Sequence, residues 1–165
     1  MNALIRKGGV LGDVLILVGA LVLQQTMARW FAVGDVRPDL TLIALTAVAL
    51  RRGPVAGLYA GLFLGLLQDV YTVDSLGADV LADSIVGYAM GFFEEKVMKV
   101  MAATRVLLLG LALIAHDLVW YLAAGFHGRG FFEALLFQSL PSAVYTLVLG
   151  AVAFYFAAGF KPREV

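Results

Sequence analysis

The 165-residue sequence contains no cysteine, only two histidines and four prolines, and just 15% of its residues are charged. Without cysteine the chain has no disulfides, no thiolate nucleophiles and no cysteine metal ligands. Twelve basic residues balance twelve acidic ones, so no net charge favours nucleic acid. The GxSxG, P-loop and dinucleotide-binding motifs are also absent from the sequence. These absences disfavour metal, nucleotide and nucleic-acid chemistry.

Apolar residues dominate instead. They make up 62% of the chain, and the mean hydropathy is +0.92. A bilayer core about 30 Å thick needs helices of about 20 mostly apolar residues. We therefore predict an all-α integral membrane protein, a compact bundle of six transmembrane helices in a single domain over residues 1–165. The predicted spans are residues 14–31, 38–50, 54–71, 76–93, 105–125 and 133–160.

Local signals support the boundaries between these spans. The run Arg51-Arg52-Gly53-Pro54 favours a helix end followed by a helix start, because arginine suits a C-terminus and proline suits a first turn. The second span is short, about 20 Å at 1.5 Å per residue. A re-entrant loop in its place would bury both arginines in hydrocarbon, so we predict that the second and third spans each cross the membrane. Pro141 lies inside the last span, where we expect a tilt or a kink.

The basic residues predict the orientation, because cytoplasmic loops retain an excess of lysine and arginine. Nine of the twelve fall on the side of the termini and three on or near the other side. We expect both termini of this multi-pass protein to be cytoplasmic. The nine are Arg6, Lys7, Arg51, Arg52, Lys96, Lys99, Arg105, Lys161 and Arg163; the three are Arg29, Arg37 and Arg129.

Glycines recur at helical spacing in two spans. Gly57, Gly61 and Gly65 are four residues apart on one face of the third span, and Gly87 and Gly91 repeat the pattern in the fourth. Such faces allow another helix to approach closely. Two interpretations remain open, packing inside this bundle or docking of another protein's helix, so these five glycines are our candidates for a partner-helix interface.

The intramembrane polar residues are candidates for structural or functional roles. Asp83 lies one turn from Asp79 on one face of its helix, and such a costly group faces a protein interior, a wet cavity or a partner. We expect a structural, hydrogen-bonded role for Asp83 rather than ion or proton transport. His116 and Asp117 are adjacent and point about 100° apart around a helix, so spacing alone does not make them a catalytic pair. We predict no metal, no cofactor and no enzymatic activity.

Several short runs together resemble the family of the bacterial rod shape-determining protein MreD. They are Pro38-Asp39-Leu40, Arg51-Arg52-Gly53, GLYAGLFLGLLQDV at residues 57–70, Leu76-Gly77 and Val86-Gly87-Tyr88. The resemblance covers nearly the whole chain in length and helix layout. It implies structural or interface roles for the matching positions, which are Asp39, Gly57, Gly61, Gly65, Asp69 and Gly77.

The resemblance also implies a function. Members of the family resemble non-catalytic scaffolds of the cell-elongation complex in the bacterial inner (cytoplasmic) membrane. They pair with the single-span protein MreC and link the cytoplasmic MreB filament to the wall-synthesising glycosyltransferase and transpeptidase. The family members themselves are surrounded by membrane lipid. Their fold is similar to that of the S-components of energy-coupling-factor vitamin transporters. The family carries no catalytic residues to transfer.

An alternative function is a transport subunit that binds a vitamin-like solute. Its site would be a largely apolar cavity between helices near the outer face, with a few convergent polar groups. The candidate residues for such a site are Asp79, Asp83, Tyr88, Asp117 and Trp120.

Overall fold

The computed structural model describes residues 9–27, 38–71, 75–96, 102–124 and 139–159. These ranges form six α-helices and contain no β-strand. The helices are α1 (Val10–Met27), α2 (Leu40–Arg52), α3 (Pro54–Asp69), α4 (Ala78–Lys96), α5 (Ala102–Ala124) and α7 (Leu140–Gly159). For the described residues, the predicted all-α class and the order of six helices are confirmed.

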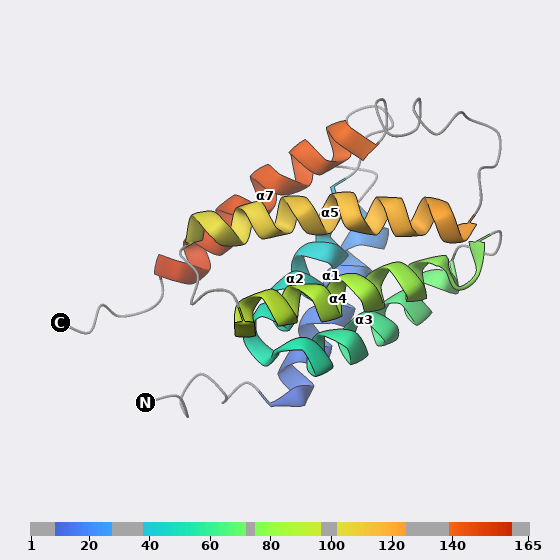
Figure 1. Ribbon diagram of the computed structural model, residues 1–165, viewed down its shortest axis with the longest axis horizontal. Coiled ribbons are helices and arrows are strands. Elements are labelled where there is room, and N and C mark those ends of the chain that lie inside the picture. Colours follow the sequence, from blue (N-terminus) through green and yellow to red (C-terminus); the bar gives the residue numbers. More distant parts are fainter. Residues whose placement is uncertain (1–8, 28–37, 72–74, 97–101, 125–138, 160–165) are drawn as a thin grey trace.

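Helix α2 is the centre of the bundle. Figure 1 shows it surrounded, with α3 and α4 side by side, α5 next to α4, and α7 beyond α5. It contacts each of the other five described helices, and eight of its thirteen residues are buried. Leu42, Leu45 and Ala49 have almost no exposed surface. A helix enclosed by protein in this way has no need of the full length of a lipid-facing span.

The start and end of α2 follow from their sequence signals. Asp39 caps the helix, because its carboxylate accepts a 2.8 Å hydrogen bond from the backbone N–H of Leu42. Arg52 is the last helical residue, and Gly53 then adopts a φ of 89°, a conformation that glycine tolerates at little cost. Pro54 occupies the first turn of α3, as the sequence predicts.

Several other helix ends differ from the predicted spans. Helix α4 ends at Lys96 and not at residue 93, and α5 begins at Ala102 and not at residue 105. Helix α1 begins at Val10, four residues before the predicted start, and Asp13 in its first turn forms a 2.7 Å ion pair with Arg52. Residues 28–31 of the predicted span lie outside the described residues, as do residues 133–138 of the last one. Pro141 is the second residue of α7. Because the residues that precede Ser139 lie outside the described ranges, the expected tilt or kink at Pro141 stays a prediction.

The five candidate glycines form the contact between α3 and α4. A methyl group added at Gly57 or Gly61 would overlap the backbone carbonyl of Gly87 or Asp83, respectively, and one added at Gly65 would overlap the backbone near Val80. Gly91 meets the backbone of the chain between α2 and α3 in the same way. The two glycine faces therefore cover each other within the chain. That another protein's helix reaches these glycines stays a prediction.

The outward faces of the bundle are apolar. Leucine, isoleucine or valine side chains are exposed on every described helix except the central α2, among them Leu15, Leu66, Ile85, Leu111 and Val148. One described helical segment, Thr104–Ala124, is long and apolar enough to cross a membrane, with a mean hydropathy of 2.0. Val10–Thr26 and Leu140–Ala153 are shorter apolar helical segments.

The backbone contact at Gly61 predicts an effect of one added methyl group. In Gly61→Ala, the new Cβ meets the Asp83 backbone, and separating α3 from α4 should cost about 2 kcal/mol or more. We expect a lower thermal unfolding midpoint for the detergent-solubilised variant. Gly19→Ala is the matched control, because nothing lies within 4 Å of its added Cβ. Equal midpoints for the two variants would contradict the proposed contact.

Candidate functional site

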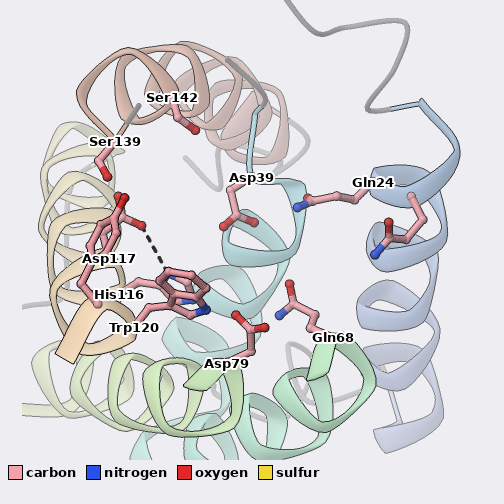
Figure 2. Close-up of a pocket in the computed structure, with 11 residues that line it drawn as sticks. Gln24, Asp39, Gln68, Asp79, His116, Asp117, Trp120, Ser139 and Ser142 are labelled. Atoms are coloured by element: carbon pink, nitrogen blue, oxygen red, sulfur yellow. Dashed lines mark hydrogen bonds and ion pairs between the residues drawn. The ribbon is translucent and has the colours of Figure 1, made fainter. Parts of the chain in front are cut away.

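Polar side chains from all six described helices meet at one end of the bundle (Figure 2). They come from the C-terminal ends of α1, α3 and α5 and from the N-terminal ends of α2, α4 and α7. Between them lies a cavity of about 350 Å³. Its lining residues are Gln24, Gln25, Asp39, Gln68, Asp79, His116, Asp117, Trp120, Tyr121, Ser139 and Ser142.

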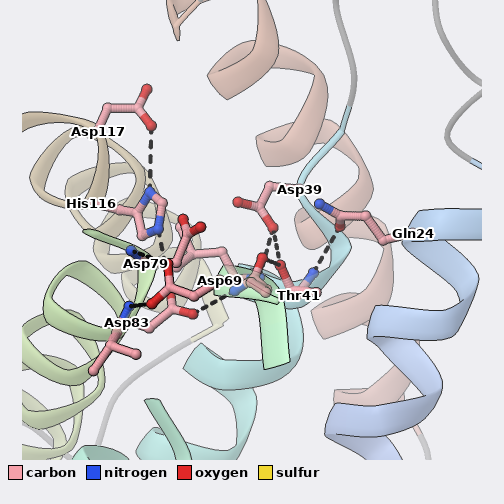
Figure 3. A network of polar contacts seen from close by, with 11 residues as sticks. Gln24, Asp39, Thr41, Asp69, Asp79, Asp83, His116 and Asp117 are labelled. Carbon is pink, nitrogen blue, oxygen red and sulfur yellow. Dashed lines mark hydrogen bonds and ion pairs between the residues drawn. The ribbon is translucent and has the colours of Figure 1, made fainter. Parts of the chain in front are cut away.

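A series of hydrogen bonds runs from the cavity wall into the bundle (Figure 3). The Thr41 hydroxyl donates to Oδ1 of Asp39 at 2.6 Å and lies 3.2 Å from Oε1 of Gln68. The amide Nε2 of Gln68 donates to Oδ2 of Asp83 at 2.6 Å. These contacts connect α2, α3 and α4 through side chains alone.

Asp83 is the most deeply buried carboxylate among the described residues, with 1% of its surface exposed. An isolated charge at such a depth is strongly unfavourable unless hydrogen-bonding groups compensate it. Besides the Gln68 amide, Nε2 of His116 lies 3.3 Å from its Oδ1. Both partners belong to neighbouring helices, as expected for a structural carboxylate.

His116 also approaches its sequence neighbour. Its Nδ1 lies 3.5 Å from Oδ1 of Asp117, at the outer limit of hydrogen bonding. Adjacent residues point about 100° apart on a helix, yet the imidazole reaches between Asp83 and Asp117 and lies close to both. The imidazole thereby links the buried network to the cavity wall.

Asp69 caps a helix other than its own. At the C-terminal end of α3, its carboxylate accepts backbone N–H groups from the start of α4: Gly77 at 2.9 Å, and Asp79 and Val80 at 3.3 Å each. Gly77 has a φ of 90°, which glycine adopts readily. This contact gives a physical reason for two of the family-pattern positions, Asp69 and Gly77.

The start of α2 is held by neighbouring helices. Oε1 of Gln24 in α1 accepts the backbone N–H groups of Leu40 at 2.6 Å and Thr41 at 3.1 Å. The backbone N–H of Asp39 donates to the hydroxyl of Thr146 in α7 at 2.9 Å. Sequence reasoning assigned no such role to Gln24 or Thr146, although a polar residue inside an apolar helix was a signal that a partner existed.

The cavity brings together three of the five residues predicted for a solute site, namely Asp79, Asp117 and Trp120. Asp83 lies beneath the lining, bonded to Gln68 and His116. Tyr88 does not line the cavity; it is 46% exposed and stacks on Phe92 farther along α4. Among the described residues, no group of three or more histidine, aspartate and glutamate side chains is arranged to hold a metal ion.

An apolar helical bundle with buried, mutually bonded polar side chains belongs to the class of helical membrane proteins. Residues 9–159 match the family described as rod shape-determining protein MreD, and the chain belongs to that family. Its role is therefore rod shape determination, and its family is generally non-catalytic. No curated protein and no solved structure matches the chain. The expected likeness to vitamin-transporter S-components stays a prediction.

The cap at Asp69 predicts a graded loss of stability. Asp69→Ala removes the acceptor of three backbone N–H groups and should lower the unfolding free energy by about 2 kcal/mol. Asp69→Asn keeps a carbonyl acceptor and should lose less. Thermal unfolding in detergent measures both variants. If alanine is tolerated as well as asparagine, the carboxylate does not stabilise α4.

Proposed function

We propose that the protein is a non-catalytic membrane scaffold of the bacterial cell-elongation complex. It binds MreC and helps couple cytoplasmic MreB filaments to the peptidoglycan glycosyltransferase and transpeptidase. The observation that carries this proposal is membership of the rod shape-determining family over residues 9–159, nearly the whole chain. The proposal treats residues 1–165 as one transmembrane domain.

The contacts that the buried polar side chains make support a scaffold role. Asp39 and Asp69 cap helices, Gln24 holds the start of α2, and Asp83 joins three helices. Apart from the cap that Asp39 gives its own helix, each of these contacts fixes one helix relative to another. Such contacts suit a bundle whose task is to present a stable surface to other proteins.

The distribution of charge supports an orientation with both termini in the cytoplasm of the inner membrane. Helix α2 runs from Asp39 at the cavity to Arg51 and Arg52 at the opposite end. At that opposite end Arg105 lies 3.8 Å from Glu94, near the end of α4. Basic residues from two separate connections thus gather away from the cavity, as the excess of positive charge on cytoplasmic loops requires. The cavity then faces outward.

A groove beside α3 is the surface we assign to the single span of MreC. It has a volume of about 320 Å³, and its walls include Val14 and Leu17 of α1 and Ala56, Ala60 and Phe63 of α3. The two alanines are four residues apart, so they form a shallow surface on which a helix can lie close. The glycine face of α3 is turned towards α4, so a partner in this groove displaces no helix of the bundle.

The groove predicts the effect of filling it. Ala56→Trp places a large side chain where the partner helix would lie and should reduce co-purification of MreC about tenfold. Ala153→Trp is the matched control, since Ala153 lies on the exposed face of α7. Elution volume and thermal midpoint check that both variants fold.

The possible outcomes test the docking surface and the scaffold role separately. Undiminished binding by a folded Ala56→Trp variant would exclude the groove as the docking surface. Failure of the wild-type chain to bind MreC under the same conditions would overturn the proposed scaffold role itself.

A further inference from the structure

The cavity at the Asp39 end of the bundle has a composition that a scaffold does not require. Its volume of about 350 Å³ lies within the range of small-molecule sites, which is about 300–1,000 Å³. We propose that this cavity binds a small primary amine in its ammonium form. The proposal goes beyond the scaffold role and does not depend on it.

The charge of the lining favours a cation. Asp39 and Asp117 contribute carboxyl groups, and no lysine or arginine is among the described lining residues. The one described lining group able to carry a positive charge is His116, which already contacts Asp83 and Asp117. A concave site surrounded by apolar helices concentrates the resulting field on whatever enters it.

The hydrogen-bonding capacity of the lining favours an occupant with N–H groups. One oxygen of Asp39 accepts two donors, Thr41 Oγ1 and the Leu42 N–H, whereas the other oxygen accepts none from a described residue. Ser139 is 8% exposed and lines the cavity, yet its hydroxyl has no partner among the described residues. Ionised carboxylates only accept hydrogen bonds, so the occupant must supply the donors.

An aromatic wall completes the match to an amine. Trp120 and Tyr121 line the cavity and pack edge to face, with ring centroids 5.4 Å apart. Figure 2 places Trp120 beside Asp117 and Asp79, around the same space as Asp39. Aromatic faces attract ammonium groups and also cover the alkyl chain that carries them. A primary ammonium satisfies the charge, the acceptors and the rings together, whereas a quaternary one lacks the N–H donors.

The test is a ligand titration of the purified full-length chain in detergent, followed by its thermal unfolding midpoint. We expect 1,4-diaminobutane to raise the midpoint saturably, because a ligand that binds only the folded state stabilises it. Neutral 1,4-butanediol should produce no saturable shift, and tetramethylammonium should bind at least about tenfold more weakly. An absent diamine effect, an equal diol effect or equal tetramethylammonium affinity would overturn the assignment.

Two variants localise the binding. Asp117→Asn should weaken the diamine affinity about tenfold, and Ser139→Ala about threefold, because each removes a charge or an acceptor from the wall. Glu94→Gln is the matched control, since it removes a carboxylate at the other end of α4 and should keep wild-type affinity. If Asp117→Asn does not fold, Ser139→Ala decides. Unchanged affinity in the folded wall variants, or equal loss in the control, would exclude the cavity.

The source of the amine is distinguished by mass spectrometry after mild extraction. A retained free amine and a retained aminophospholipid both support the ammonium site, and the mass tells them apart. A retained anionic solute that the diamine displaces would overturn it. MreC is absent from all of these measurements, so their failure would leave the scaffold proposal standing.

Discussion

The backbone contact between α3 and α4 is the constraint on which the rest of the site depends. Because Gly57, Gly61 and Gly65 have no side chains, the two helices touch along their backbones. Only at this separation does Gln68 reach Asp83 at 2.6 Å and Asp69 reach the start of α4. The glycine spacing thus positions polar groups that do not themselves form the contact between α3 and α4.

Polar groups buried in the apolar bundle explain how the helices are held relative to one another. Such a group is costly without a partner, because neither lipid nor a leucine core supplies one. Several partners come from other helices: Gln24 from α1 and Thr146 from α7 hold the start of α2, and His116 from α5 reaches Asp83. The central helix can therefore be short, since it is held at its N-terminal end by side chains of its neighbours rather than by lipid.

The sequence was informative about elements and uninformative about contacts between them. The six-helix order, the boundary at Arg52 and Pro54 and the close-packing role open to the glycines all follow from local chemistry, which a linear pattern records. The cap from Asp69 and the imidazole contacts of His116 were not predicted. Each depends on which helices become neighbours and how each is rotated about its axis, and neither appears in local spacing.

The groove proposed for the partner helix and the cavity both include residues of α1. Val14 and Leu17 form a wall of the groove in the half of α1 near Asp13, while Gln24 lines the cavity at the other end and accepts the first N–H groups of α2. Residues on one helix are rigidly related over this length, because backbone hydrogen bonds link every turn. A ligand that restrains α1 against α2 in the cavity would therefore also fix one wall of the groove. If the cavity binds a ligand and the groove binds a partner helix, as proposed, each binding event would change the affinity of the other through the position of α1.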